Sequence, residues 1–118
     1  MLSNKRIVIT GAAGTLGQAC AAVAQRHGAE VVGIDIVTSA DMPAGGSYCQ
    51  VDLLDREATH ACIAGLGSLD ALLNIAGGFA MGTTAADPSD DQWNWMFRIN
   101  VETLRNTVMA AVPLLQGQ

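Results

Sequence analysis

The sequence predicts an α/β domain built on a parallel sheet. Short apolar runs rich in β-branched residues alternate with longer stretches of helical periodicity, a pattern typical of parallel strands that are covered by helices on both faces. Its 118 residues amount to about one domain. Because 50% of the residues are hydrophobic and only 14% are charged, we expect a packed core. We find no repeat, linker or low-complexity tract, so one domain is expected over residues 1–118.

Apolar periodicity and turn residues define the expected elements. Gly28 fits the left-handed position that ends a helix, and Asp55 fits the N-cap of the next helix. Ser89 and Gln92 form a capping box for the last helix, in which Pro113 is expected to kink or end the final turn. The expected strands are 7–10, 30–34, 48–53 and 70–75. The first expected helix follows the first strand and its glycine loop and ends at about residue 27, the second covers 55–64, and the last begins at residue 89.

Charge and composition exclude several classes of protein. The formal net charge is −5 and no basic cluster exists, which argues against nucleic-acid binding. No apolar run approaches the roughly 20 residues that span a bilayer, and residues 1–6 do not resemble a secretory signal. Cys20, Cys49 and Cys62 lack metal-ligand spacing, which favours free thiols in a reducing cytoplasm over disulfides or a metal site.

Gly11, Gly14 and Gly17 form a Gly-x-x-Gly-x-x-Gly loop between the first expected strand and the first expected helix. In that context, glycine permits a tight turn, close approach of a pyrophosphate, and packing of helix on strand. The helix N-terminus then offers unpaired N–H groups and a positive dipole end to the phosphates. The loop therefore predicts a dinucleotide site.

Asp35 ends the second expected strand, 18 residues after Gly17. There its carboxylate can accept hydrogen bonds from the adenosine ribose hydroxyls; the alternative is a glycine turn beside a solvated aspartate. An anionic Asp35 would repel a 2′-phosphate, and Ile36, Ala12 and Ala13 supply no cation. The sequence thus predicts NAD over NADP as the cofactor.

Four short motifs now resemble those of the short-chain dehydrogenase/reductase family, in the family's order and with similar gaps. They are Thr-Gly-Ala-Ala-Gly-Thr-Leu-Gly at 10–17, Asp-Leu at 52–53, Asn-Ile-Ala-Gly at 74–77, and Asn-Val at 100–101. The match covers essentially the whole chain, aligned to the N-terminal half of a family member. The resemblance implies a doubly wound Rossmann fold, of which this chain holds the first four strands in the order 3-2-1-4.

The resemblance also implies roles for individual residues. Asp52 would bind the adenine amino group, although a strand-end cap is an equal alternative. Asn74 would brace the central sheet. Asn100 would be the asparagine of the catalytic Asn-Ser-Tyr-Lys tetrad, the alternative being a structural amide bonded to nearby backbone. The implied cofactor-binding residues are Gly11, Gly14, Thr15, Leu16, Gly17, Asp35, Asp52, Leu53, Asn74, Ala76 and Gly77.

Family chemistry is hydride transfer between nicotinamide and an alcohol or carbonyl carbon, with a Tyr-x-x-x-Lys pair as the acid/base. This sequence has one tyrosine, Tyr48, and one lysine, Lys5, so the motif cannot be formed from these residues. We therefore expect a cofactor-binding half, truncated before the catalytic Ser, Tyr and Lys and inactive by itself. Two alternatives remain: a non-catalytic dinucleotide-binding or regulatory module, and, because Thr15 stands where classical members have their second glycine, an extended-type nucleotide-sugar epimerase fragment.

The last expected helix carries a long apolar stripe. An open strand edge and an uncovered stripe favour association, so a homo-oligomer formed through this helix is expected. Trp93 is expected in the core and Trp95 at the surface or an interface. The stripe comprises Trp93, Phe97, Val101, Leu104, Val108, Val112 and Leu115.

Overall fold

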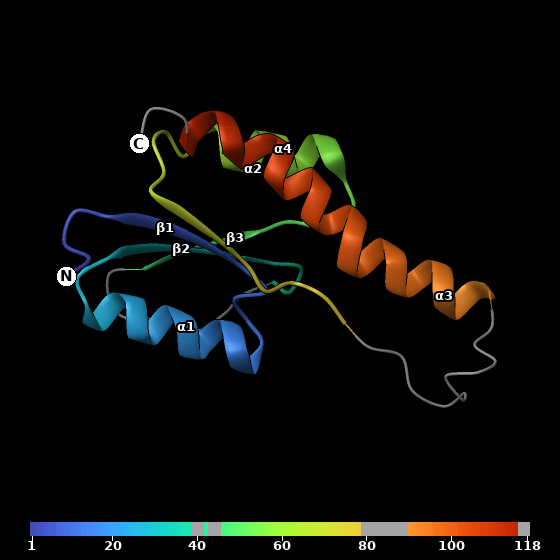
Figure 1. Cartoon of the computed structure of the whole chain (residues 1–118), viewed down its shortest axis with the longest axis horizontal. Coiled ribbons are helices and arrows are strands. Elements are labelled where there is room, and N and C mark those ends of the chain that lie inside the picture. The colour runs from blue at the N-terminus through green and yellow to red at the C-terminus, as the bar shows by residue number, and fades with distance from the viewer. Residues whose placement is uncertain (39–41, 43–45, 79–89, 116–118) are drawn as a thin grey trace.

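A computed structural model describes residues 1–38, 42, 46–78 and 90–115 of the chain (Figure 1). The described strands and helices follow one another along the first two-thirds of the sequence in the expected order. The elements are β1 (Arg6–Thr10), α1 (Thr15–Arg26), β2 (Glu30–Asp35), β3 (Ser47–Gln50), α2 (Arg56–Ala64), β4 (Ala71–Asn74), α3 (Asp90–Phe97), a π-helical segment η1 (Arg98–Glu102) and α4 (Thr103–Leu115).

The four described strands form one sheet in the order β3-β2-β1-β4. All three pairings are parallel, which confirms the predicted topology. Thr10 at the end of β1 lies opposite Ile34 in β2 and Asn74 in β4. The carboxyl ends of three neighbouring strands therefore meet at one edge of the sheet.

Helices cover both faces of the sheet: α1 lies on one face, and α2 and α4 lie on the other (Figure 1). Alternate residues of β1 point to opposite faces, since Ile7 and Ile9 pack with α1 while Val8 packs on the α2 side. Strands buried on both faces need continuous apolar runs, which is why the sequence of β1 lacks polar alternation.

Helix ends follow the local sequence rules. Gly28 has φ +95° and donates its N–H to the carbonyl of Gln25, which confirms the left-handed end of α1. The Asp55 carboxylate accepts the N–H of Ala58 at 3.1 Å, which confirms the cap of α2. Ser89, of the predicted capping box, lies outside the described residues.

The predicted third strand was too long. Its expected range was 48–53, but β3 ends at Gln50. The cause is a turn that begins at Asp52, whose carboxylate accepts the N–H of Leu54 at 3.0 Å while its carbonyl accepts the N–H of Asp55 at 2.9 Å. A side chain that closes its own turn competes with the strand ladder.

The last helix also differs from its prediction. It is interrupted by η1, where the N–H of Thr103 reaches the carbonyl of Arg98, five residues back. Pro113 does not end α4, which continues to Leu115, and the carbonyl of Leu114 is satisfied by the N–H of Leu69 at 3.2 Å. No helix in the described part of the chain is long and apolar enough to span a membrane.

Much of the expected apolar stripe is exposed. Trp93, expected in the core, is 62% exposed, because α3 projects beyond the sheet (Figure 1). Trp95 is exposed, as expected. Exposed apolar residues of α3, η1 and α4 are Trp93, Trp95, Phe97, Val101, Leu104, Met109 and Val112.

Candidate nucleotide-binding site

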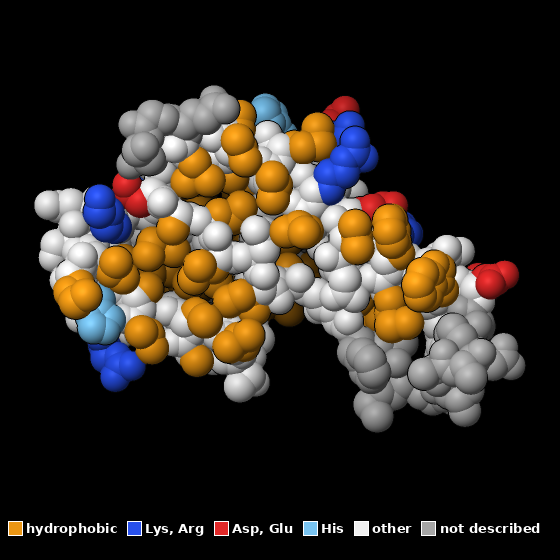
Figure 2. All heavy atoms as spheres, viewed as in Figure 1, with side chains coloured by type: hydrophobic (Ala, Val, Ile, Leu, Met, Phe, Trp, Pro, Cys, Tyr) orange, Lys and Arg blue, Asp and Glu red, His pale blue; other side chains and the backbone are white. Residues whose placement is uncertain are grey.

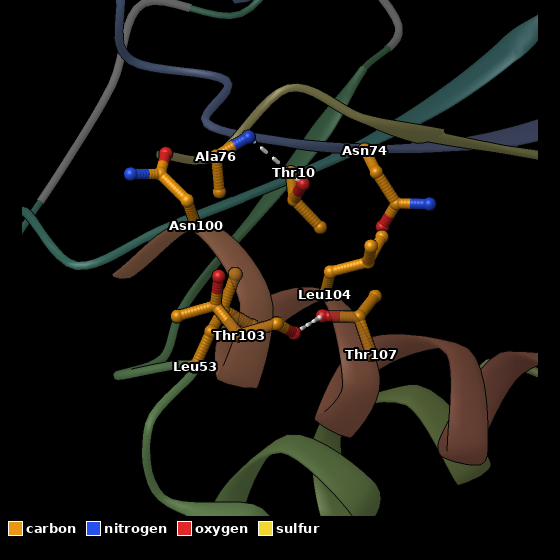
Figure 3. Close-up of a pocket in the computed structure, with 8 residues that line it drawn as sticks. All are labelled: Thr10, Leu53, Asn74, Ala76, Asn100, Thr103, Leu104 and Thr107. Carbon is orange, nitrogen blue, oxygen red and sulfur yellow. Dashed lines mark hydrogen bonds between the residues drawn. The ribbon is translucent and has the colours of Figure 1, made fainter. Parts of the chain in front are cut away.

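Three hollows lie at the carboxyl edge of the sheet. One of about 310 Å³ lies over the glycine loop, and one of about 330 Å³ extends from Asp35 past Asp52 to Trp95. These two share Asp35, Ala76 and Gly77 as lining residues. A third, of about 90 Å³, lies deeper, at the ends of β1 and β4 (Figure 3). Crevices outside the carboxyl ends of strands are where open α/β sheets bind ligands.

Two of the three loop glycines are required by the fold itself. Gly11 has φ +70°, and a Cβ there would lie 2.8 Å from the backbone nitrogen of Ala76. A Cβ on Gly17 would overlap the carbonyl oxygen of Gly11. Both positions bring backbone segments into contact, so a side chain on Gly11 would push the loop away from the segment after β4, and one on Gly17 would push α1 away from the loop.

Gly14 is different, because nothing in the part of the chain that the structure describes requires its hydrogen side chain. A Cβ there would meet only the carbonyl oxygen of Gly11, at an ordinary 3.5 Å. Gly14 has φ −78° and ψ 171°, which any residue can adopt, and it is the N-cap of α1 without a side-chain cap. It lines the 310 Å³ hollow, so its open side faces a space beside uncapped helix N–H groups.

Asp35 stands at the junction of the two larger hollows. One carboxylate oxygen accepts the N–H of Ala13 at 3.0 Å, and the other accepts the N–H of Ile36 at 2.7 Å. A carboxylate has about four lone-pair sites, so each oxygen keeps capacity for a further donor. The side chain is half-buried, and its position is fixed by backbone on two sides.

Asp52 and Leu53 line the 330 Å³ hollow. Asp52 is exposed, and its carboxylate closes the turn described above. Leu53 is buried, and its carbonyl accepts the side-chain amide of Asn106 at 2.9 Å. That bond joins the turn after β3 to α4.

The segment after β4 is held by a threonine hydroxyl. The Oγ1 of Thr10, 1% exposed, accepts the N–H groups of Ile75 and Ala76 at 3.2 Å each, and Figure 3 shows the Ala76 bond. Asn74 lies at the end of β4, and its side chain points toward Leu104 of α4 (Figure 3). Ala76 and Gly77, in the segment that Thr10 holds, line both larger hollows.

Asn100 lies in η1 and pairs with one glycine. Its Oδ1 accepts the N–H of Gly78 at 3.1 Å, and its Nδ2 donates to the carbonyl of Gly78 at 2.9 Å and to that of Met96 at 2.9 Å. The Asn100 amide is therefore held in place by backbone groups of Gly78 and Met96. A Cβ on Gly77 would overlap the Asn100 Oδ1, so this contact also requires glycine there.

Several positioning residues were missed from the sequence. Thr10, Asn106 and Thr107 are buried polar residues with satisfied side chains. Asn106 lies on a helix that reads as amphipathic, and Thr107 bonds the carbonyl of Thr103 at 2.7 Å (Figure 3). In the sequence, polar residues adjoin the apolar stripe of the last helix. This pattern indicates buried hydrogen bonds only when the element that packs against the helix is known.

Tyr48 lies away from the hollows. Its hydroxyl donates to the carbonyl of Val37 at 2.5 Å. Burial, with the negative charges of Asp35 and Cys49, raises its pKa above the usual 10.0. The phenol stays neutral and acts as a hydrogen-bond donor to the segment after β2.

The sequence matches a protein family described as short chain dehydrogenase over residues 5–118. The chain belongs to this family. Short-chain dehydrogenases are oxidoreductases that bind a nicotinamide cofactor and act on small molecules, and the fold seen here is theirs.

Individual short-chain dehydrogenases show the same relationship. The chain is 34% identical to the short chain dehydrogenase ausX of Penicillium brasilianum, covering 93% of this chain and 46% of that protein. The aldohexose dehydrogenase of Thermoplasma acidophilum superposes with a TM-score of 0.85 at 23% identity over 97% of this chain and 45% of the other. The NADH-dependent reductase A1-R′, solved with NAD, superposes with a TM-score of 0.82 at 26% identity, over 97% of this chain and 53% of the reductase. The chain spans about half the length of the curated relatives it matches.

Proposed function

We propose that this chain is the cofactor-binding half of an NAD-dependent short-chain dehydrogenase. The observation that carries the proposal is Gly14, a glycine whose open side is not needed by the fold and faces a hollow at an uncapped helix N-terminus. Such a position fits a pyrophosphate approaching the backbone. Bound NAD would supply hydride transfer with an alcohol or carbonyl substrate.

In this proposal, the two larger hollows bind different parts of the dinucleotide. The N–H groups at Thr15, Leu16 and Gly17 would face the pyrophosphate in the 310 Å³ hollow. Asp35, between the hollows, would accept the adenosine ribose hydroxyls. Asp52 would face the adenine in the 330 Å³ hollow, and Leu53 would form its apolar floor. The residues lining these hollows support this assignment.

The preference for NAD rests on charge. The two Asp35 oxygens already accept backbone N–H groups, which hold the carboxylate in place. A 2′-phosphate placed beside this carboxylate would meet like charge, and Ile36 offers no compensating cation. We therefore retain NAD over NADP as the proposed cofactor.

The catalytic half of the proposal concerns residues outside this sequence. Tyr48 holds the Val37 carbonyl and has no lysine four residues later, so we propose that Ser and Tyr-x-x-x-Lys segments follow in a longer protein. Asn100 would serve as the tetrad asparagine, its amide held by Gly78. The missing motif equally favours the second candidate, a non-catalytic dinucleotide-binding module.

Association through the last helix is also proposed. Hydrophobic side chains gather on the α3 end of the molecule (Figure 2), where Trp93, Trp95 and Phe97 are exposed. We propose that two copies cover these faces. Three free thiols among the described residues favour a reducing compartment, so cytoplasm stays the proposed location.

Isothermal titration of the 118-residue chain with NAD and with NADP tests the proposed function. Tighter binding of NAD supports it, and absence of binding to either nucleotide contradicts it. An alcohol-oxidation assay then separates the parts of the proposal: NAD binding without turnover is expected, whereas robust turnover by this chain would refute the assignment of catalysis to a following segment.

A further inference from the structure

Two cysteine thiols from different elements meet outside the candidate site. Cys49 is in β3 and Cys62 is in α2, and their sulfur atoms lie 2.7 Å apart, with the Cys62 thiol donating to the Cys49 sulfur. A disulfide bond is about 2.05 Å long, so a shift of roughly 0.7 Å would complete one. Both side chains are half-buried and pack against the same core cluster.

The fold holds this contact in place on both sides. Cys49 lies opposite Ile34 in the β2–β3 ladder, and α2 is fixed by the buried Thr59 and Ile63 and by its Asp55 cap. The two sulfurs therefore meet because two anchored elements face each other. Cys20 lies on α1, against the other face of the sheet, and has no part in the contact.

Metal binding does not explain this pair. Zinc sites in proteins generally use three or four side-chain ligands. In residues 1–38, 42, 46–78 and 90–115, no group of three or more His, Cys, Asp or Glu residues could hold a metal ion. The chemistry left to two adjoining thiols is their oxidation.

We propose that Cys49 and Cys62 form a redox modification site, which a hydroperoxide converts to an intramolecular disulfide and a small thiol restores. With hydrogen peroxide, the two S–H bonds and the O–O bond break, one S–S bond forms, and two water molecules leave. The two electrons pass from the sulfurs to the peroxide oxygens. The reaction begins with a sulfenic acid on one cysteine and ends when the second sulfur displaces hydroxide from it.

The local environment assigns the order of these steps. Burial, followed by the hydrogen bond to Cys49, raises the pKa of Cys62 to about 12, so Cys62 stays protonated at neutral pH. Because Cys62 donates its proton to the Cys49 sulfur, and the thiolate is the form that attacks peroxide, the proposed order begins with oxidation of Cys49. Cys62 then attacks the Cys49 sulfur, and its proton leaves with the departing hydroxide as water.

The disulfide would close a loop around part of the proposed nucleotide site. Residues 50–61 lie between the two cysteines, and they include Asp52 and Leu53 of the 330 Å³ hollow. The modification itself does not depend on nucleotide binding. It is therefore tested without nucleotide, and failure of NAD binding would leave this proposal standing.

Peptide mapping of the reduced 118-residue chain after hydrogen peroxide treatment tests the proposal. Remaining thiols are blocked with iodoacetamide, and trypsin then places the three cysteines in separate peptides, 7–26, 27–56 and 57–98. We expect 27–56 linked to 57–98, two hydrogen atoms lighter than their sum, with Cys20 recovered alkylated. Dithiothreitol added before the blocking step should return both peptides unlinked.

Variants and unfolding supply the controls. Cys20→Ser should keep the linked peptide, whereas Cys62→Ala should lose it and leave a sulfenic acid on Cys49 that dimedone traps. The same oxidation in concentrated urea should link Cys20 as readily as the other two. Alkylated Cys49 and Cys62 after native oxidation of the wild type, or links to Cys20 at equal yield, would overturn the proposal without relying on the fold of any variant.

Discussion

The carboxylate of Asp35 accepts the backbone N–H of Ala13 at 3.0 Å. This bond ties the end of β2 to the glycine loop after β1, so one side chain both shapes the loop and stands where a ribose would bind. Replacement of Asp35 by alanine would mix these two effects. An amide at the same position separates them, because its oxygen can still accept the Ala13 N–H while the charge is gone.

Asp35→Asn is expected to weaken NAD binding and to relax the discrimination against NADP. Hydrogen bonds to a charged group are worth about 1.5–3 kcal/mol, so NAD affinity should fall roughly 10- to 100-fold, while NADP affinity should fall less or rise. Calorimetric titration of both nucleotides measures the ratio. A ratio identical to that of the wild type would contradict the charge argument.

Gly14→Ala and Gly17→Ala form a matched pair of variants. They separate a glycine needed for nucleotide binding from a glycine needed for stability of the fold. Gly14→Ala should change the free energy of unfolding by less than about 0.5 kcal/mol but weaken nucleotide binding at least tenfold. Gly17→Ala should cost about 1–3 kcal/mol of stability through overpacking against Gly11. Urea unfolding and nucleotide titration report the two effects. Equal loss of stability in both variants would show that Gly14 has no special open side.

Asn100→Ala is expected to free the Gly78 backbone from both of its bonds. Each hydrogen bond contributes about 0.5–1.5 kcal/mol, and Asn100→Asp should keep the acceptor for the Gly78 N–H while losing the two donations. Amide hydrogen exchange at Gly78 should thus accelerate in the alanine variant and much less in the aspartate variant. If exchange were slow in both, the paired arrangement would be wrong.

Alkaline pH should destabilise the protein through Cys62. Its pKa is about 12 in the folded chain against 9.0 for an ordinary thiol, so the unfolded chain ionises first. The stability contribution is therefore fully present below about pH 9 and is lost as the pH rises toward 12. Urea unfolding under reducing conditions from pH 8 to 10.5 should show this decline. Cys62→Ala should flatten it, and Cys20→Ser should leave it unchanged.

Trp93→Lys is expected to reduce self-association. A charge at the centre of an exposed apolar face opposes its burial against a second copy, so the sedimentation coefficient at high protein concentration should shift toward the monomer. Lys5→Glu, far from α3, is the charge-altering control. A wild-type chain that stays monomeric at high concentration would argue against association through this helix.

Local rules in the sequence predicted most of the fold. The apolar runs of β1 and β2, the left-handed Gly28 and the Asp55 cap depend on neighbours within a few residues, and all appear as predicted. The glycine loop was also predictable from the sequence, because the strand, the glycines and the helix are adjacent along the chain. These features need no knowledge of distant contacts.

Features that depend on distant partners were not predictable in the same way. The early end of β3 reflects competition between a strand ladder and the Asp52 turn. Exposure of Trp93 depends on what lies across from α3 rather than on its helical spacing. The Cys49–Cys62 contact required the actual register of β3 against β2 and the position of α2, and the cysteine spacing alone had indicated only free thiols.

The π-helical segment alters the phase of the last helix. One residue of an α-helix turns the chain by about 100°, so the single extra residue that a π turn accommodates rotates everything after it relative to α3. That rotation lets the Asn100 amide meet Gly78 while Ala110 and Ala111 face the core. Deleting one residue there would change the direction in which Asn100 faces relative to Ala110 and Ala111 by about 100°, so the Gly78 contact and the core contacts would not both keep their present alignment.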